Sequence, residues 1–145
     1  MVEDRNGPGI MTGQIFADHA PDYLEAGLVV FPTGGDDGKL PLVKNWQKFG
    51  RRAGFELIKR FPDANIGVRD GGNGITRIDI DDCTLVSDAI RRFGDTPIMV
   101  STPSGGQHLW YRSSGERRIL RLEGVGIDVL GNGGYGVAPP MRVGG

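Results

Sequence analysis

Apolar and polar residues alternate along most of the second half of the chain, which predicts a sheet protein. The clearest alternation runs through GITRIDI (74–80), and it returns in QHLWYRS (107–113), GIDVLG (126–131) and YGVAPP (135–140). PIMVST (97–102) is a further predicted strand. Side chains of a strand point to opposite faces in turn, so each segment predicts one buried face and one working or solvent face.

Helical spacing is confined to three segments. TLVSDAIRRF (84–93) has apolar residues three and four positions apart, and Asp82 or Thr84 can cap it. QIFADHAPDYLEA (14–26) contains a proline, which predicts a helix broken or restarted at that residue. FELIKRF (55–61) predicts a short helix that stops before the next proline.

The remaining segments complete a mixed α+β architecture. LVVFP (28–32) predicts a strand, and GGDDGKLPLVKNW (34–46) predicts a long loop. NIGVR (65–69) and the strand at 74–80 are joined by DGGN, which predicts a β-hairpin. The fold class that follows is α+β, with helices packed on a mostly antiparallel sheet.

Length and composition set the class of protein. The 145 residues fit one domain over residues 13–145, preceded by a flexible N-terminus at residues 1–12. Cys83 is the only cysteine, which excludes an internal disulfide and a cysteine-based zinc cluster and suits a reducing compartment. No segment has the length of an apolar membrane span, and the N-terminus lacks the pattern of a signal peptide. We therefore expect a cytoplasmic protein without zinc or membrane contact.

Charge is balanced overall but unevenly distributed. The formal net charge of -1 argues against an indiscriminate nucleic-acid binder. Residues 39–60 nevertheless hold seven basic residues against one acidic, and residues 63–88 hold six acidic residues against two basic. Both segments are also typical of solvated surface, so the motifs within them must decide their role.

The acidic segment contains RIDIDD (77–82), with three aspartates in four positions. On a strand, Asp79 and Asp81 project to the same face about 6.5 Å apart, while Ile78 and Ile80 point into the core. Two like charges at that spacing raise each other's pKa and reduce stability, so a compensating cation is expected. A pair of divalent metal ions would supply it and suits phosphoryl transfer. The structural alternative is an aspartate pair that only caps a helix and a turn.

Two later motifs add candidate ligands. STPSGGQHLWYR (101–112) contains the tight turn SGG, whose amides can form an anion-binding nest, and His108 follows it at a place suited to a triphosphate. Asp128 lies on an apolar strand, where an isolated buried carboxylate is costly, so it is the natural third metal ligand. A purely structural histidine and an edge-strand aspartate that blocks aggregation are the alternatives.

The order of these motifs resembles a known family. DxD, then SGGxH, then an apolar-flanked aspartate followed by a glycine turn and GYGVAPP is similar to the archaeo-eukaryotic primase superfamily, and specifically to the primase-polymerase domain of plasmid, phage and other mobile-element replication proteins. The resemblance spans roughly residues 20–142 and includes GKLPLVKNW (38–46).

The resemblance implies a set of site residues. The carboxylates that it implies hold two catalytic Mg²⁺ or Mn²⁺ ions are Asp79, Asp81 and Asp128. The groups that it implies bind the phosphates of the incoming nucleotide are His108, Ser104 and the amides of Gly105 and Gly106. Arg112 shares the strand face of His108 and is expected to reach a nucleotide phosphate.

The resemblance also implies a fold and a reaction. The fold is an RNA-recognition-like (RRM-like) sheet with packed helices and a small N-terminal α/β unit. In the reaction, a 3'-hydroxyl attacks the α-phosphate of a ribo- or deoxynucleoside triphosphate, a single-stranded DNA template directs the addition to a primer, and pyrophosphate leaves. The protein would then be a DNA primase and polymerase of a prokaryotic, phage or plasmid system.

The basic segment is the predicted contact to the template. Its candidate DNA-binding residues neutralise phosphates or stack on a base, and they are Lys39, Lys44, Trp46, Lys48, Arg51 and Arg52. Phe49 is an alternative stacking residue, and Trp46 can equally be a core anchor. The cluster of Arg117, Arg118 and Arg121 is either a mobile phosphate-binding loop or a plain solvated loop.

Other functions remain open at this stage. The chain ends at Gly145, where the family usually continues, so we expect a compact catalytic core, a fragment of a longer chain or a reduced relative. A helicase or another replication partner is expected in the longer chain or complex. A metal-dependent nuclease uses the same residue types. A catalytically idle nucleotide- or DNA-binding replication domain is the alternative outside the enzymes.

Overall fold

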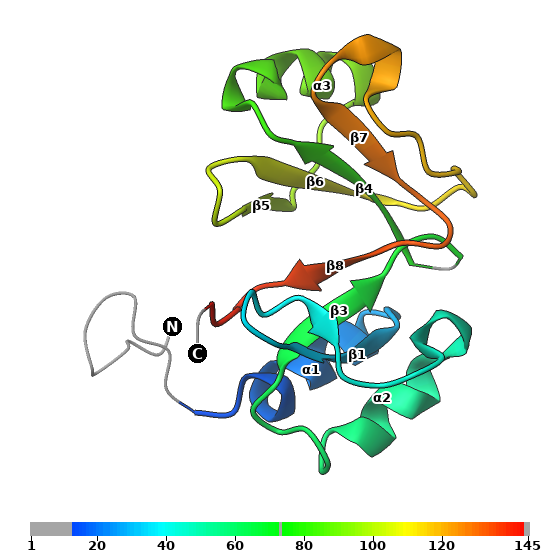
Figure 1. Ribbon diagram of the computed structural model, residues 1–145. Helices are drawn as coiled ribbons and strands as arrows, with labels where there is room; N and C mark the ends of the chain where they lie inside the picture. Colours follow the sequence, from blue (N-terminus) through cyan, green and yellow to red (C-terminus); the bar gives the residue numbers. More distant parts are fainter. Residues whose placement is uncertain (1–12, 73, 144–145) are drawn as a thin grey trace. The chain divides into compact units, whose positions relative to one another are not determined.

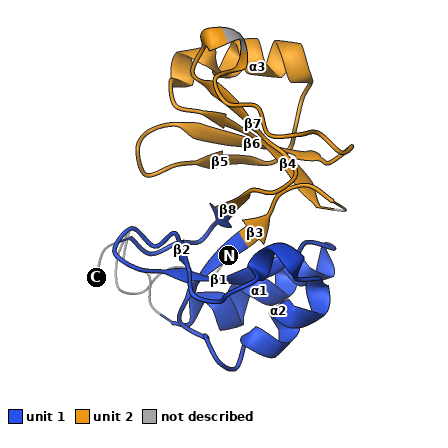
Figure 2. Ribbon diagram, turned by 45° about the vertical axis from the view of Figure 1, so that its right-hand side comes forward, with its two compact units in different colours: residues 1–67, 137–145 blue, residues 68–136 orange. Residues whose placement is uncertain are grey.

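The structure is a computed structural model that describes residues 13–72 and 74–143, without the side chain of residue 123. The predicted flexible N-terminus, residues 1–12, lies outside the described residues. The chain divides into two compact units (Figure 2), unit 1 with residues 1–67 and 137–145 and unit 2 with residues 68–136. The chain enters unit 2 within strand β3 (Asn65–Arg69) and leaves it within strand β8 (Tyr135–Ala138).

Unit 1 packs two helices on a sheet. Its other elements are α1 (Ile15–Glu25), β1 (Val30–Gly34), β2 (Leu40–Pro41), the 3₁₀ turn η1 (Trp46–Lys48) and α2 (Arg51–Leu57). The sheet has the strand order β2-β1-β3-β8. Buried apolar side chains from α1, β1, α2 and β3 form its core. The predicted strand and short helix are therefore present, and α2 begins earlier and ends earlier than the spacing of its apolar residues indicates.

The prediction of a broken helix at residues 14–26 was wrong. Pro21 lies inside α1, and the helix continues through it to Glu25. A proline in a helix interior removes one backbone hydrogen bond and costs about 3 kcal/mol. Phe16, Ala20 and Leu24 are completely buried on one face of this helix, so their burial outweighs that cost.

Unit 2 is built on an antiparallel sheet of four strands. Its elements are β4 (Ile75–Ile80), the 3₁₀ turn η2 (Cys83–Leu85), α3 (Val86–Phe93), β5 (Met99–Ser101), β6 (Gln107–Arg112), the 3₁₀ turn η3 (Leu122–Gly124) and β7 (Ile127–Leu130). The strand order is β5-β6-β4-β7, and every pairing in this sheet is antiparallel (Figure 1). The two units together make an α+β protein, as the pattern of the sequence predicts.

Helix α3 covers one face of this sheet. Buried Ile78 and Ile80 of β4 meet Leu109 of β6 and Ala89 of α3 in a single apolar cluster. The side chain of Asp82 accepts hydrogen bonds from the amide and the hydroxyl of Thr84, at 2.9 and 2.7 Å, and so caps the turn that leads into the helix. The predicted helix, its cap and the inward face of the DxD strand are confirmed.

The predicted hairpin of residues 65–69 and 74–80 was wrong. Strands β3 and β4 belong to different sheets, and β3 lies between β1 and β8. Four of the five residues of β3 are buried, so this strand is internal to its sheet and has no free edge for β4. Between the two strands, the amide of Asp70 donates to Gly134 O at 2.9 Å and the amide of Gly71 donates to Ile75 O at 2.7 Å.

No helix in the described part of the chain combines the length and the apolar character that crossing a membrane requires.

Candidate active site

Three predicted site residues lie in one line across the sheet of unit 2. Asp79 on β4 is directly opposite His108 on β6 and directly opposite Asp128 on β7. Residues that face each other across antiparallel strands have their side chains on the same face. This face is the one opposite α3, because the flanking Ile78 and Ile80 take the α3 side. We call these three residues the polar row.

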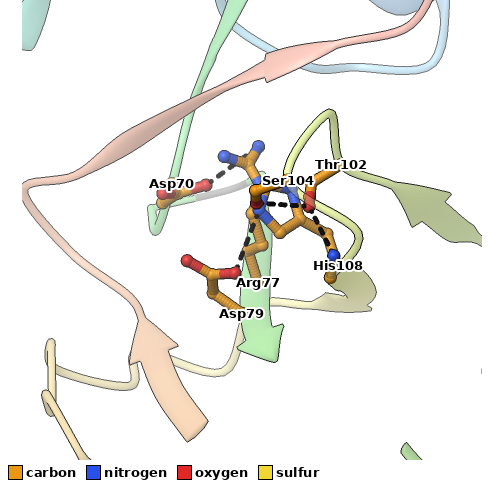
Figure 3. Close-up of polar contacts among 7 residues, drawn as sticks. Asp70, Arg77, Asp79, Thr102, Ser104 and His108 are labelled. Carbon is orange, nitrogen blue, oxygen red and sulfur yellow. Dashed lines mark hydrogen bonds and ion pairs between the residues drawn. The ribbon is translucent and has the colours of Figure 1, made fainter. Parts of the chain in front are cut away.

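The histidine and the central aspartate of the polar row are in contact. His108 Nε2 contacts Asp79 Oδ1 (Figure 3), at a distance of 3.3 Å. The two side chains are 15% and 27% exposed. His108 Nδ1 is buried and has no hydrogen-bond partner among the described residues. Nε2 is therefore the nitrogen that faces the carboxylate.

Asp128 lies on β7, at the edge of the sheet. Its Oδ1 accepts a hydrogen bond of 2.7 Å from the amide of Arg121. The segment before η3 crosses this edge, since Ile119 and Val129 exchange backbone hydrogen bonds of 2.8 and 2.7 Å. The predicted arginine cluster at 117–121 therefore runs along β7. Asp128 holds that segment and also faces Asp79.

The carboxylates suit a divalent cation in their chemistry. The Cβ atoms of directly opposed residues are about 5 Å apart, and like charges at that distance destabilise a sheet. Asp81 is exposed just beyond β4, where its amide makes a long contact of 3.4 Å to Gly126 O. Carboxylate oxygens are the donors that Mg²⁺ and Mn²⁺ prefer. Within residues 13–72 and 74–143, however, no three acidic, histidine or cysteine side chains already surround one point.

The SGG turn differs from the predicted anion nest. The amide of Gly105 donates to Thr102 O and the amide of Gly106 donates to Thr102 Oγ1, each at 3.0 Å. Both amides thus have acceptors inside the turn. A Cβ on Gly106 would lie 2.4 Å from Ile80 O, so glycine is required for the turn to approach the end of β4. Ser104 is exposed, and its hydroxyl lies 3.3 Å from that of Thr102.

The structure adds a buried ion pair that the sequence reasoning missed. Arg77 Nη2 lies 3.3 Å from Asp70 Oδ1, and both side chains are 0% exposed. Arg77 also lies over the ring of Trp110, with its Cζ 5.3 Å from the ring centroid. The available signal was the position of Arg77, two residues before Asp79 and so on the same face of β4. Its partner Asp70 could not be identified, because it comes from the connection before the strand.

The electrostatics of this pair link it to the polar row. Burial raises the pKa of Asp70 to about 7, and the charges of Arg77 and Arg118 oppose that rise. Burial lowers the pKa of Arg77, while the charges of Asp70 and Asp79 raise it. Arg77 is therefore the protein's own cation next to the DxD motif.

Arg112 is exposed at the end of β6 and lies opposite Ile75. It is four residues after His108 on the same strand and shares its face.

The predicted DNA-contact residues of unit 1 are three exposed lysines, and a tryptophan and two arginines that contact other residues of unit 1. Lys39, Lys44 and Lys48 are exposed. Trp46 stacks on buried Phe31, with ring centroids 4.8 Å apart, which supports its role as an anchor. Arg51 Nε donates to Leu24 O at 2.8 Å, and Arg52 lies 3.6 Å from Glu56 on the exposed face of α2.

A pocket of about 400 Å³ lies wholly within unit 1, and none of the predicted site residues lines it. Glycines of the loop after β1, together with Arg60, Phe61 and Arg142, form part of its wall. Its volume is suitable for a small ligand, and Asp63 is the one acidic residue among those that line it.

A comparison with protein families supports the resemblance that the order of the motifs indicates. A family model described as bifunctional DNA primase/polymerase, N-terminal (Prim-Pol), matches residues 20–145. The match includes the polar row, the SGG turn and the basic segment. No curated protein matches the chain.

Proposed function

The chain belongs to the family of bifunctional DNA primase/polymerase N-terminal domains, and on that premise we propose that it is a template-directed nucleotidyltransferase. It would add nucleoside triphosphates to a 3'-hydroxyl on a single-stranded DNA template. The observation that carries this proposal is the polar row, in which Asp79 lies opposite both His108 and Asp128 on the face of the sheet opposite α3.

Asp79, Asp81 and Asp128 are the residues that would hold two divalent ions, Mg²⁺ or Mn²⁺. When bound, such ions neutralise phosphate charge and make the 3'-hydroxyl a better nucleophile. The direct opposition of Asp79 and Asp128 supports this role, because two carboxylates at that spacing favour a cation between them.

His108 and Ser104 are the proposed contacts to the triphosphate. Nε2 of His108 is the imidazole nitrogen that faces Asp79, and it would donate to a phosphate oxygen. The exposed Ser104 hydroxyl is a second donor, and Arg112 would add positive charge from the end of β6. The amides of Gly105 and Gly106 contribute by holding the turn, since Thr102 already accepts from both.

The exposed lysines of the basic segment would neutralise template phosphates without reading sequence. In a longer chain or a complex, a helicase would supply the single strand.

Primer extension tests the proposal. Purified protein is incubated with primed and unprimed single-stranded DNA, Mn²⁺ or Mg²⁺ and either ribo- or deoxynucleotides. We expect metal-dependent extension that Asp79→Asn abolishes. Asp88→Asn is the matched control, because Asp88 is an exposed aspartate on α3 paired only with Arg91 in the described structure. Equal extension by the parent and Asp79→Asn would contradict the proposal.

The same assay separates the nuclease alternative. Incubation of labelled DNA with metal and without nucleotides leaves the strand intact if the protein is a polymerase. Cleavage that depends on Asp79 would instead assign the site to phosphodiester hydrolysis, which uses the same residue types.

His108→Ala tests the proposed division of roles. Because His108 would contact the nucleotide rather than the template, we expect this change to raise the KM for the nucleotide about tenfold or more. The Kd for single-stranded DNA should change less than twofold. The reverse pattern in a nucleotide and a DNA titration would assign His108 to DNA binding.

A further inference from the structure

The buried pair of Asp70 and Arg77 has a position that simple stabilisation does not require. Arg77 shares a strand and a face with Asp79, and about 6.5 Å separates alternate residues of a strand. Its cross-strand neighbours are Trp110 and Leu130, so it occupies the row of the sheet next to the polar row. A charged side chain with no exposed surface is costly to bury, and apolar residues at this place would be cheaper.

The surroundings of Arg77 hold it in one place. Asp70 faces the guanidinium at 3.3 Å, the ring of Trp110 lies against it, and the chain around Gly136 closes over it. A Cβ on Gly136 would lie 1.1 Å from Arg77 Nη1, and one on Gly134 would lie 3.2 Å from Asp70 Oδ2. Gly134 in the turn after β7 and Gly136 in β8 thus leave room for the ion pair.

The ion pair leaves part of the arginine's capacity unused. None of the three guanidinium nitrogens has a well-aligned hydrogen-bond acceptor among the described residues. The other carboxylate whose charge interacts with Arg77 is Asp79. A fixed cation therefore lies beside two carboxylates, Asp79 and Asp128, that repel each other across the sheet.

We propose that Arg77 is a built-in counter-charge for the polar row, and that the Asp70–Arg77 pair sets how tightly the row binds a divalent cation. Arg77 offsets the repulsion between Asp79 and Asp128 when no ion is present, so the row stays ordered. The same positive charge repels an incoming ion, so the row holds free metal weakly. Asp70 limits that repulsion by neutralising Arg77. The inference rests on the proposed function in one respect, that the polar row binds a divalent ion.

Two changes to the pair shift metal affinity in opposite directions. Asp70→Asn removes the neutralising partner and leaves Arg77 as a full positive charge, so Mn²⁺ should bind roughly tenfold more weakly. The double variant Asp70→Asn with Arg77→Met removes the fixed cation and keeps similar side-chain volumes, so Mn²⁺ should bind roughly tenfold more tightly. Damage to packing alone would weaken binding in both variants.

The test measures the Kd of Mn²⁺ for the intact chain at pH 8 without nucleotide. The electron paramagnetic resonance signal of free Mn²⁺ reports how much of the ion is unbound. Circular dichroism checks that each variant is folded. Arg91→Met is the matched control, because it removes an exposed arginine of α3, which covers the other face of the sheet, and should change the Kd less than twofold. Shifts of the two pair variants in the same direction, or no shift in the double variant, would overturn the counter-charge.

The Asp79→Asn variant separates this result from the proposed function. Loss of Mn²⁺ binding in Asp79→Asn together with opposite shifts in the pair variants supports both. If the parent protein binds no Mn²⁺, or if Asp79→Asn binds it as tightly as the parent, the metal site and the counter-charge are overturned together. Asp79-dependent binding without opposite shifts overturns the counter-charge alone. If Asp70→Asn does not fold, the affinity of the double variant decides.

Discussion

The two faces of the sheet in unit 2 are made by alternate residues of the same strands, and they differ in what they contribute. On the α3 side, Ile78, Ile80 and Val129 pack into an apolar cluster. On the other side, the same strands carry Asp79, Asp128 and His108. Neighbouring residues in the sequence thus have different roles: those on one face stabilise the fold, and those on the other face form the polar row.

The apolar face explains how a small sheet stays folded with opposed carboxylates on its other face. Burial of large aliphatic side chains contributes about 1.5–3 kcal/mol for each, whereas opposed like charges cost a fraction of that. The free energy gained by burial on the apolar face therefore exceeds the cost of the opposed charges on the polar face. Substitutions on the two faces should separate activity from stability.

The largest expected effect is on catalysis, from Asp128→Asn. The amide keeps an oxygen that can accept from the amide of Arg121, but it loses the charge that faces Asp79. We expect primer extension to fall about 10³-fold or more, in line with the several kcal/mol that metal ions contribute to such reactions. The melting temperature should stay the same or rise, since a repulsion is removed. Extension within threefold of the parent would show that Asp128 only holds the β7 edge.

The next largest expected effect is on stability rather than on activity, and it comes from the adjacent residue, Val129. Val129→Ala removes two buried methyl groups from the α3 face and should lower the free energy of unfolding by about 2 kcal/mol. Urea denaturation measures this loss. Extension per folded molecule should match that of the parent, and a loss of activity larger than the loss of folded protein would contradict the division between the faces.

The ion pair beside the polar row predicts a pH dependence of stability. Asp70 has a pKa of about 7 in the folded protein and an ordinary value of 3.8, so the folded state binds the extra proton between these values. The stability that protonated Asp70 contributes is fully present below about pH 4 and is lost as the pH rises to about 7. The free energy of unfolding falls over this range by at most about 1.4 kcal/mol per pH unit. Urea denaturation of the parent and of Asp70→Asn at pH 5 and pH 8 measures the difference. A parent-minus-variant difference that does not fall with pH would be inconsistent with a raised pKa.

The smallest expected effects separate the two groups of basic residues in unit 1. Lys44 is exposed, so Lys44→Ala should leave stability unchanged and lower the slope of log affinity for single-stranded DNA against log salt by about 0.7. Arg51→Ala should instead cost about 1–2 kcal/mol of stability, because its guanidinium donates to the end of α1. Fluorescence anisotropy at several salt concentrations measures the first effect. An unchanged salt slope in Lys44→Ala would remove that lysine from the DNA contact.

The sequence was sufficient where local pattern decides the structure. Alternation alone predicts that Ile78 and Ile80 of β4 point into the core, and the Asp82 cap follows from residue type and position. The order of the DxD, SGGxH and Asp128 motifs carries the family, which the match over residues 20–145 confirms. Which residues of these motifs bind metal or nucleotide stays a prediction.

Pairing between distant segments is what the sequence could not predict. The DGGN connection has the composition of a hairpin turn, yet β3 is internal to another sheet. The partner of Arg77 comes from that same connection, and two glycines more than fifty residues later leave room for the pair. The SGG turn is a local case: it has the composition of an anion nest, but Thr102, just before it, accepts from both of its amides. Each of these outcomes depends on contacts that form only in the folded chain.

The polar row can be tested in crystals soaked with Mn²⁺ and a non-hydrolysable nucleoside triphosphate, measured at an X-ray wavelength where manganese scatters anomalously. We expect an anomalous peak between the carboxylates of Asp79 and Asp128, with the triphosphate beside His108. A manganese peak elsewhere, with Asp79 and Asp128 pointing away from it, would contradict the assignment of the polar row as the active site.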